Sequence, residues 1–129
     1  MITYNSLISI SFFVVGIIHT LPILGASSNQ TLEKLYGLPI EDANLSLLLR
    51  HRAILFACVS LVFYYAAFDS RYRVIGFWIG YMSILSFILF YYQNKDLNAN
   101  LKRVFLMDTI ALVFLILGTF LYLFSSERN

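Results

Sequence analysis

Charged residues are scarce in this sequence: they make up 12% of the 129 residues, whereas hydrophobic residues make up 60%. A soluble domain of this size could not bury so much apolar surface, which excludes an ordinary water-soluble fold. The lysines and arginines are scattered, and the formal net charge is only +2. Without a basic cluster a nucleic-acid partner is excluded as well, so we expect membrane lipids to be the main partners.

Cysteine is nearly absent, since Cys58 is the only one. A single cysteine excludes an intrachain disulfide and a multi-cysteine metal cage. His19 and His51 lie in separate apolar stretches and are of the residue type that ligates haem, but no further sequence feature marks a haem site. We therefore expect no metal and no other cofactor.

Long apolar stretches dominate what is present. Crossing a membrane takes about 20 mostly apolar helical residues, because the hydrocarbon layer is about 30 Å thick and a helix rises about 1.5 Å per residue. Four such stretches occur, at about 5–24, 44–68, 74–92 and 104–124. Short connections force neighbouring helices to run antiparallel. The sequence thus predicts an all-α fold, a four-helix up-down transmembrane bundle that forms a single domain over residues 1–129.

The first stretch and the loops predict the location of the chain. The first stretch lacks the basic start of a signal peptide, so we expect it to be retained as a span. Four spans place both termini on one side of the membrane. Basic residues are more frequent in the first and third connections than at the opposite ends of the helices. This pattern predicts a multi-pass protein of the bacterial inner membrane with both termini outside.

The connection after the first span has structure of its own. A short helix is expected over about 29–36, with a cap at Ser28 or Asn29 and a stop at Gly37. Its apolar face should lie on the membrane surface, with Lys34 facing water, and the helix is well placed to act as a lid. The residues that share this apolar face are Leu32, Leu35 and Tyr36.

A run of small residues marks one face of the third span. Gly76, Gly80 and Ser83 recur at helical spacing and let another helix backbone approach closely. Two alternatives stay open for this face. It packs inside the chain, or it forms a homodimer or binds a larger partner for which this chain is an accessory subunit.

Ionisable groups from separate helices are expected to share one layer of the membrane. Counting back from the opposite membrane face places His19, His51 and Asp108 roughly 21 to 26 Å from it. Tyr92 closes the third span at the same level. The opposite leaflet holds few polar groups apart from aromatic hydroxyls. This layer is therefore the predicted ligand-binding region, formed by Arg50, His51, Arg52, Asp108 and Tyr92.

Helix geometry predicts which of these groups face inward. A carboxylate inside the membrane needs a partner, so Asp108 should face the bundle interior and pair with an arginine. Arg50 and Arg52 lie about 200° apart around their helix, so only one of them faces the interior. Because small residues share the face of Arg50, we expect Arg50 and His51 to be the inward pair.

Several segments resemble a family of small four-helix bacterial membrane proteins for which no activity is established. They are Leu35-Tyr36-Gly37, Asn44-Leu45, the stretch 49–56 with its Arg-His-Arg-Ala core, Ser86-Phe87, and 98–108. The resemblance implies a shared architecture with Arg50, His51, Arg52 and Asp108 as positions of interest. Some members carry the label phosphopantetheine adenylyltransferase. This sequence does not support that label, because it has neither a His-x-Gly-His motif nor a soluble α/β domain to hold a nucleotide.

Three classes of function follow from this pattern. The first is a lipid-binding or accessory membrane module whose polar layer holds headgroups. The second is a membrane enzyme that acts on an amphiphilic lipid, quinone or isoprenoid-like small molecule, with His51 or His19 as acid or base and Asp108 as the group that orients a cation. Transport ranks last, because secondary transporters bind substrate near the midplane and this midplane is apolar.

Overall fold

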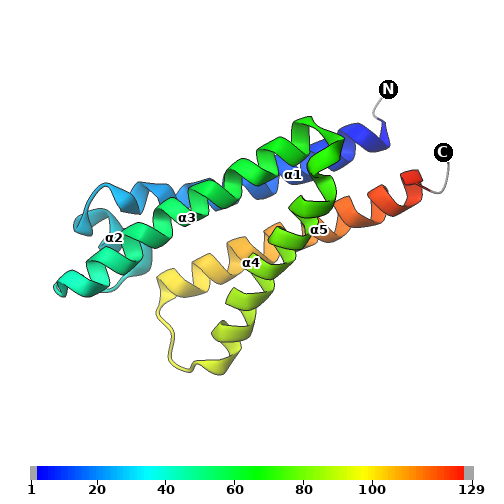
Figure 1. The fold of residues 1–129 in the computed structure, drawn as a ribbon. Helices are drawn as coiled ribbons and strands as arrows, with labels where there is room; N and C mark the ends of the chain where they lie inside the picture. Colours follow the sequence, from blue (N-terminus) through cyan, green and yellow to red (C-terminus); the bar gives the residue numbers. More distant parts are fainter. Residues whose placement is uncertain (1–2, 127–129) are drawn as a thin grey trace.

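The computed structural model describes residues 3–126 and contains four long helical segments (Figure 1). In chain order they are α1 (Tyr4–Thr20), continued by the 3-10 helix η1 (Leu21–Ala26), then α3 (Ala43–Phe68), α4 (Arg73–Gln93) and α5 (Ala99–Ser126). Each is long and apolar enough to cross a membrane. The chain is therefore an all-α, multi-pass membrane protein, which confirms the predicted fold class.

The helix bounds agree with the apolar stretches except at the start of α5. This helix begins at Ala99, about one turn before the apolar run. The reason is local, because the side chain of Asn98 accepts a hydrogen bond from the backbone N–H of Leu101 at 2.9 Å. An asparagine in that position caps a helix and satisfies one of its free N–H groups. Residues 99–103, among them the polar Asn100, Lys102 and Arg103, are thereby included in the helix.

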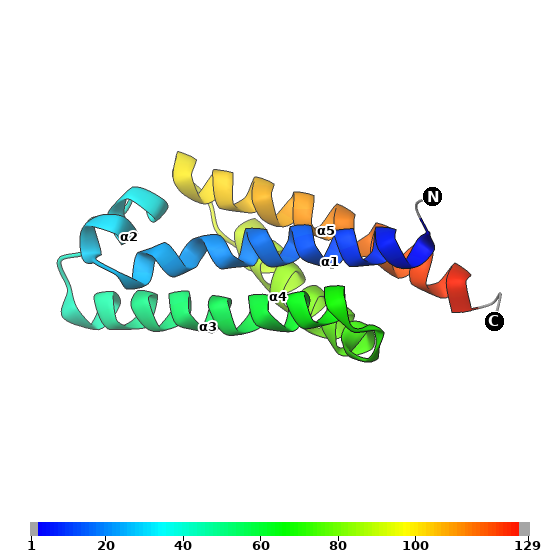
Figure 2. The same ribbon diagram turned by 90° about the horizontal axis from the view of Figure 1, so that it is seen from above.

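The helix α1 lies in the middle of the bundle, with α3 on one side and α5 on the other (Figure 2). The helix α4 runs at a steep angle to α3, to which the short turn η2 (Ser70–Tyr72) joins it (Figure 1). As a result α4 diverges from α3 toward Gln93, while its end still packs on α5, where the ring centroids of Tyr91 and Phe105 lie 4.0 Å apart (Figure 1). The start of α1 and the end of α5 lie at the same end of the bundle.

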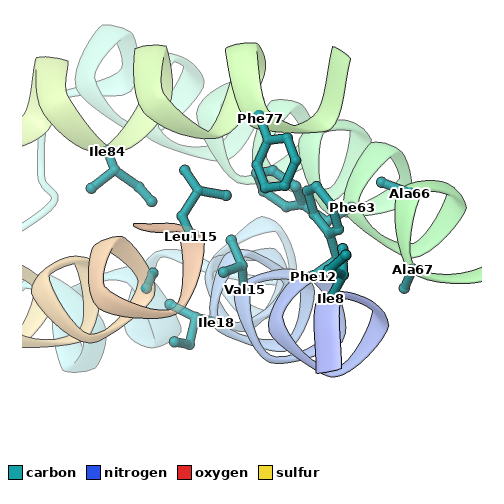
Figure 3. Packing of buried hydrophobic residues seen from close by; sticks show 11 residues of the cluster. Ile8, Phe12, Val15, Ile18, Phe63, Ala66, Ala67, Phe77, Ile84 and Leu115 are labelled. Carbon is teal, nitrogen blue, oxygen red and sulfur yellow. The ribbon is translucent and has the colours of Figure 1, made fainter. Parts of the chain in front are cut away.

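The main core forms where α4 crosses the other helices. Buried apolar side chains from α1, α3, α4 and α5 meet there, as Figure 3 shows. The small residues of α4 make this approach possible, since a Cβ on Gly76 would lie 2.8 Å from Phe12 and 2.9 Å from Ala66. A Cβ on Gly80 would lie 2.8 Å from Leu115. The glycine face of α4 thus contacts helices of its own chain.

A second, smaller core lies under α2 (Asn29–Tyr36), whose bounds match the predicted short helix. Ser28 caps it, and Gly37 ends it with φ 65°, a left-handed conformation that suits glycine. Asn98 and Asn100 of the α5 region donate to the backbone carbonyls of Tyr36 and Lys34, both at 2.9 Å. These bonds tie α2 across the end of the bundle, over the start of α5.

Candidate functional site

A cavity of about 210 Å³ lies at the end of the bundle that α2 covers. It is enclosed by the end of α1 with η1, by α2, by α3 and by α5, so that four segments distant in sequence contribute to it. Its lining residues are Ile18, His19, Leu21, Pro22, Lys34, Leu35, Tyr36, Arg52, Phe56, Asn100, Arg103, Val104, Met107 and Asp108. We take this cavity as the candidate site.

The cavity has a charged part and an apolar part. Lys34, Arg52 and Arg103 bring three positive charges, against which Asp108 is the single carboxylate. The rest of the wall is largely apolar. A wall that combines cations with apolar surface suits a ligand with a negative head and an apolar chain.

His19 is fixed in one orientation on the cavity wall. Its side chain is 1% exposed, and its Nδ1 lies 3.0 Å from the carbonyl oxygen of Val15. A carbonyl can only accept, so Nδ1 carries the proton and donates it there. The neutral ring then presents Nε2 as an acceptor, to which the hydroxyl of Ser83 donates at 3.3 Å. Helix α4 thereby helps to hold the imidazole of α1 in place.

Asp108 lies on the inner face of α5. Its side chain borders the cavity and the residue is 7% exposed, which confirms that it faces the interior. The predicted ion pair is wrong, because within residues 3–126 no lysine or arginine nitrogen lies within 4.0 Å of its oxygens. The carboxylate instead faces the cavity without a bound cation.

Arg52 is the inward arginine of α3. Its guanidinium carbon lies 5.0 Å from the ring centroid of Phe56, 5.7 Å from that of Tyr36 and 6.0 Å from that of Phe87. Flat guanidinium groups stack on aromatic faces and keep their N–H donors in the ring plane available. No group in residues 3–126 accepts a hydrogen bond from it. Stacking on the aromatic rings holds the guanidinium away from Asp108, so the ion pair does not form and the donors of Arg52 remain available to a ligand.

Arg50 and His51 face away from the cavity, so their prediction as the inward pair is wrong. Both are exposed and border a separate shallow hollow, where Nε of Arg50 donates to the carbonyl of Ala26 at 3.0 Å. The prediction followed the small residues next to Arg50. The buried face of α3 is instead set by residues further along, Phe63 and Ala67 among them, and this face is centred closer to Arg52.

Tyr92 also lies outside the cavity. It is 73% exposed, and its ring packs edge-on against Phe105 at 5.7 Å. It borders another surface hollow, at the turn between α4 and α5. The cause is the divergence of α4 from α3, which carries the end of α4 away from Arg52. Tyr92 therefore does not reach the cavity, although it lies at the same depth in the membrane as the cavity residues.

Sequence reasoning missed two cations of the site. Lys34 was expected only to face water, yet it borders the cavity from α2. Arg103 precedes the predicted start of the last span at about residue 104, yet the cap at Asn98 places it within α5, where it borders the same cavity. The expected position of the short helix as a lid was the signal that could have found Lys34. No comparable signal pointed to Arg103.

No protein-family model, curated protein or solved structure matches this chain. The resemblance to a bacterial membrane-protein family therefore stays a prediction. What the site does has to be argued from its own residues.

Proposed function

We propose that this membrane protein is a lipid-binding module whose cavity holds the anionic head of an amphiphile. The observation that carries the proposal is the composition of the cavity wall, in which Lys34, Arg52 and Arg103 outnumber the single carboxylate of Asp108 beside an apolar surface. Unbalanced positive charge beside an apolar surface within a membrane favours an anion. The ligand class that follows is a phosphate- or carboxylate-bearing lipid.

Arg52 is the expected main contact of the headgroup. Its guanidinium has N–H donors free, and arginine binds phosphate or carboxylate oxygens through two parallel hydrogen bonds. The aromatic rings of Tyr36, Phe56 and Phe87 hold the group in place before a ligand arrives. A preformed donor loses less conformational entropy on binding, which strengthens the interaction.

The size of the cavity limits which part of the lipid it holds. Pockets for whole drug-sized ligands have volumes of roughly 300 to 1,000 Å³, whereas this cavity measures about 210 Å³. The headgroup and the first part of a chain fit such a volume. The remaining chain would lie in the surrounding bilayer, against exposed apolar side chains such as Leu55 and Leu106.

The experiment compares the two arginines of α3. The purified chain is delipidated, phosphatidylglycerol is added, and native mass spectrometry counts the lipids retained. We expect Arg52→Gln to weaken retention about 10- to 100-fold, since a charge-assisted hydrogen bond contributes about 1.5 to 3 kcal/mol. Arg50→Gln removes the same charge two residues away and should retain lipid as the wild type does.

Equal losses in both variants would show that general surface charge holds the lipid, and would contradict the proposal. A wild-type chain that binds no lipid but retains a second polypeptide would favour the accessory-subunit role instead. Retention of phosphatidylglycerol no better than that of an uncharged diacylglycerol would contradict the choice of an anionic head.

A catalytic role is the second candidate, and the orientation of His19 favours it. The Val15 carbonyl fixes the tautomer, so Nε2 is the basic atom, and Asp108 borders the same cavity. An acid or base in this position would be His19 rather than His51, which lies outside. If the chain is an enzyme, incubation with a membrane lipid extract should yield a product that His19→Gln abolishes while lipid retention persists. Product formation that survives this substitution would eliminate His19 as the acid or base.

A further inference from the structure

Arg73 forms a second polar site at the other end of the bundle. It is the first residue of α4 and is 6% exposed, so its guanidinium is buried against α1. One terminal nitrogen donates to the side-chain oxygen of Asn5 at 2.9 Å. The other donates to the carbonyl of Asn5 at 3.4 Å and to the hydroxyl of Ser9 at 3.3 Å. All three of these acceptors are neutral.

No carboxylate in residues 3–126 balances this charge. The one ion pair of that part of the chain joins neighbouring Arg71 to Asp69 at 2.6 Å, on the exposed side of the turn. Nε of Arg73 is buried and has no hydrogen-bond partner. A buried cation with only neutral partners is costly in a membrane protein, and an anion beside it lowers that cost.

A hollow of about 550 Å³ adjoins this guanidinium. It opens beside η2 and the last turns of α5, and it is lined by Asn5, Phe68, Ser70, Arg71, Arg73, Tyr122 and Ser125. Seven residues from five elements thus surround it, and two of them are arginines. The hollow is lined by Asn5 at the start of α1, whereas the cavity is lined by His19 at its end. Figure 2 shows that these two ends of α1 lie at opposite ends of the bundle. A bilayer around the bundle would place the two sites at opposite faces.

We propose that this hollow binds the phosphate of a second anionic lipid, held by Arg73 in the leaflet opposite the cavity. The proposal does not rest on the function proposed for the cavity, because the two sites share no residue. Arg73 supplies the charge, and Asn5 and Ser9 fix its orientation toward α1. The hydroxyl-bearing Ser70 and Tyr122 add polar groups to the wall on which a headgroup would lie.

A carboxylate of this chain is the competing source of negative charge. Glu127 lies two positions after Ser125, which lines the hollow, but it is outside the residues that the structure describes. A lipid phosphate and a glutamate carboxylate would satisfy the guanidinium by the same chemistry. The experiment therefore needs an arm that removes this carboxylate.

The test again adds phosphatidylglycerol to the delipidated chain and counts the retained lipids by native mass spectrometry, now with variants at this end of the bundle. We expect the wild type to retain two lipids per chain, and Arg73→Gln and Arg52→Gln to retain one each. The double variant should retain none. Arg50→Gln is the control, because it removes an exposed charge that lines neither the cavity nor the hollow, and it should retain two lipids. Glu127→Gln should retain two as well.

Three outcomes would overturn the proposal. In the first, Arg73→Gln still retains two lipids. In the second, Arg50→Gln loses a lipid as readily as Arg73→Gln does, which would reduce the effect to surface charge. In the third, the wild type retains one lipid and Glu127→Gln retains two, which would assign the hollow to the chain's own carboxylate. A wild-type chain that retains one lipid, which Arg73→Gln removes and Arg52→Gln does not, would instead contradict the function proposed for the cavity.

Because Arg73→Gln removes hydrogen bonds to α1, it could prevent folding. Arg73→Lys keeps the charge at this position and gives a second means of testing. Lysine has a single nitrogen, so it cannot contact Asn5 and Ser9 with one group and a phosphate with another as a guanidinium can. We expect this variant to fold and to bind the second lipid several-fold more weakly in a titration. A folded Arg73→Lys chain with unchanged affinity at that site would overturn the proposal.

Discussion

Each end of the bundle has an inward-facing arginine in a membrane helix, and the two arginines are held by different contacts. At the cavity end, Arg52 rests on three aromatic rings and keeps its donors free. At the other end, Arg73 uses its donors on Asn5 and Ser9 and so joins α4 to α1. The comparison teaches that Arg52 is arranged mainly to meet a ligand, whereas Arg73 also holds two helices together.

Each inward arginine has an outward neighbour two residues away. Arg50 and Arg71 are exposed, whereas Arg52 is half-buried and Arg73 is buried. Two residues correspond to about 200° around an α-helix, so Arg50 and Arg52 cannot share a face of α3. Arg71 lies in the turn η2 and lines the hollow together with Arg73. Arg50 lines neither site and therefore gives a control of equal charge for Arg52. Substitutions can therefore separate the effect of position from the effect of charge.

The largest expected effect is a loss of stability that disturbs the sites at both ends of the bundle, because it comes from the core between them. Gly76→Leu would force a side chain into Phe12 and Ala66, which a Cβ alone would already approach to 2.8 and 2.9 Å. Overpacking typically costs 1 to 3 kcal/mol, and we expect about 3 kcal/mol here because backbone-attached Ala66 cannot move aside. Thermal unfolding in detergent measures it, with the exposed Val74→Leu as control. Unchanged stability would show that α4 does not pack here.

Removing a partner of Arg73 tests its role in joining helices. Asn5→Ala leaves one terminal nitrogen without the acceptor that lies 2.9 Å away. A hydrogen bond to a charged group contributes about 1.5 to 3 kcal/mol, so the free energy of unfolding should decrease by about 2 kcal/mol. Asn44→Ala, at an exposed position of α3, is the control. A loss of lipid from the cavity in Asn5→Ala would contradict the independence of the two ends.

Neutralising Asp108 tests the charge balance of the cavity. Asp108→Asn removes the one negative charge among three cations, so an anionic headgroup should bind about fivefold more tightly, a change on the order of 1 kcal/mol. A titration with phosphatidylglycerol measures this change. Weaker binding would mean that Asp108 orients Arg52 for the ligand, and would contradict the assignment of Arg52 as an independent anion-binding group.

The smallest effect concerns the exposed pair in the turn before α4. Hydrogen bonds from Arg71 lower the pKa of Asp69 below its usual 3.8. Because the folded-state pKa is the lower one, the pair contributes stability above the ordinary pKa and loses it as the pH falls through the lowered value. Asp69→Asn should therefore change the melting temperature less than Asn5→Ala at neutral pH, and its effect should become smaller as the pH falls below the ordinary pKa of 3.8. A larger effect than that of Asn5→Ala would reverse the ranking.

The fold could be predicted from the sequence because its signals are local and long. Four apolar stretches exceed the length needed to cross a membrane, and the pattern from Ser28 to Gly37 specifies α2 through its two caps. The early start of α5 was missed because a single side chain, that of Asn98, decides it. The steep angle of α4 depends on which side chains meet in the core, which helix periodicity does not reveal.

The candidate site could be predicted only in part. Helix lengths place His19, Arg52 and Asp108 at one depth, and the structure brings these three to one cavity. Which of the remaining side chains face the cavity depends on the rotation of each helix about its axis. The choice between Arg50 and Arg52 depended on which residues of α3 pack against the other helices. The site at Arg73 was missed, although Asn5 and Ser9 stand one turn apart on α1 opposite an arginine that opens α4.

The most direct test is a crystal structure grown from a lipid mesophase that contains phosphatidylglycerol. The account predicts density for a phosphate within hydrogen-bond distance of the guanidinium of Arg52, with the lipid chain leading from the cavity into the bilayer. Ordered lipid around Arg50 and His51 beside a cavity that holds only water would contradict it.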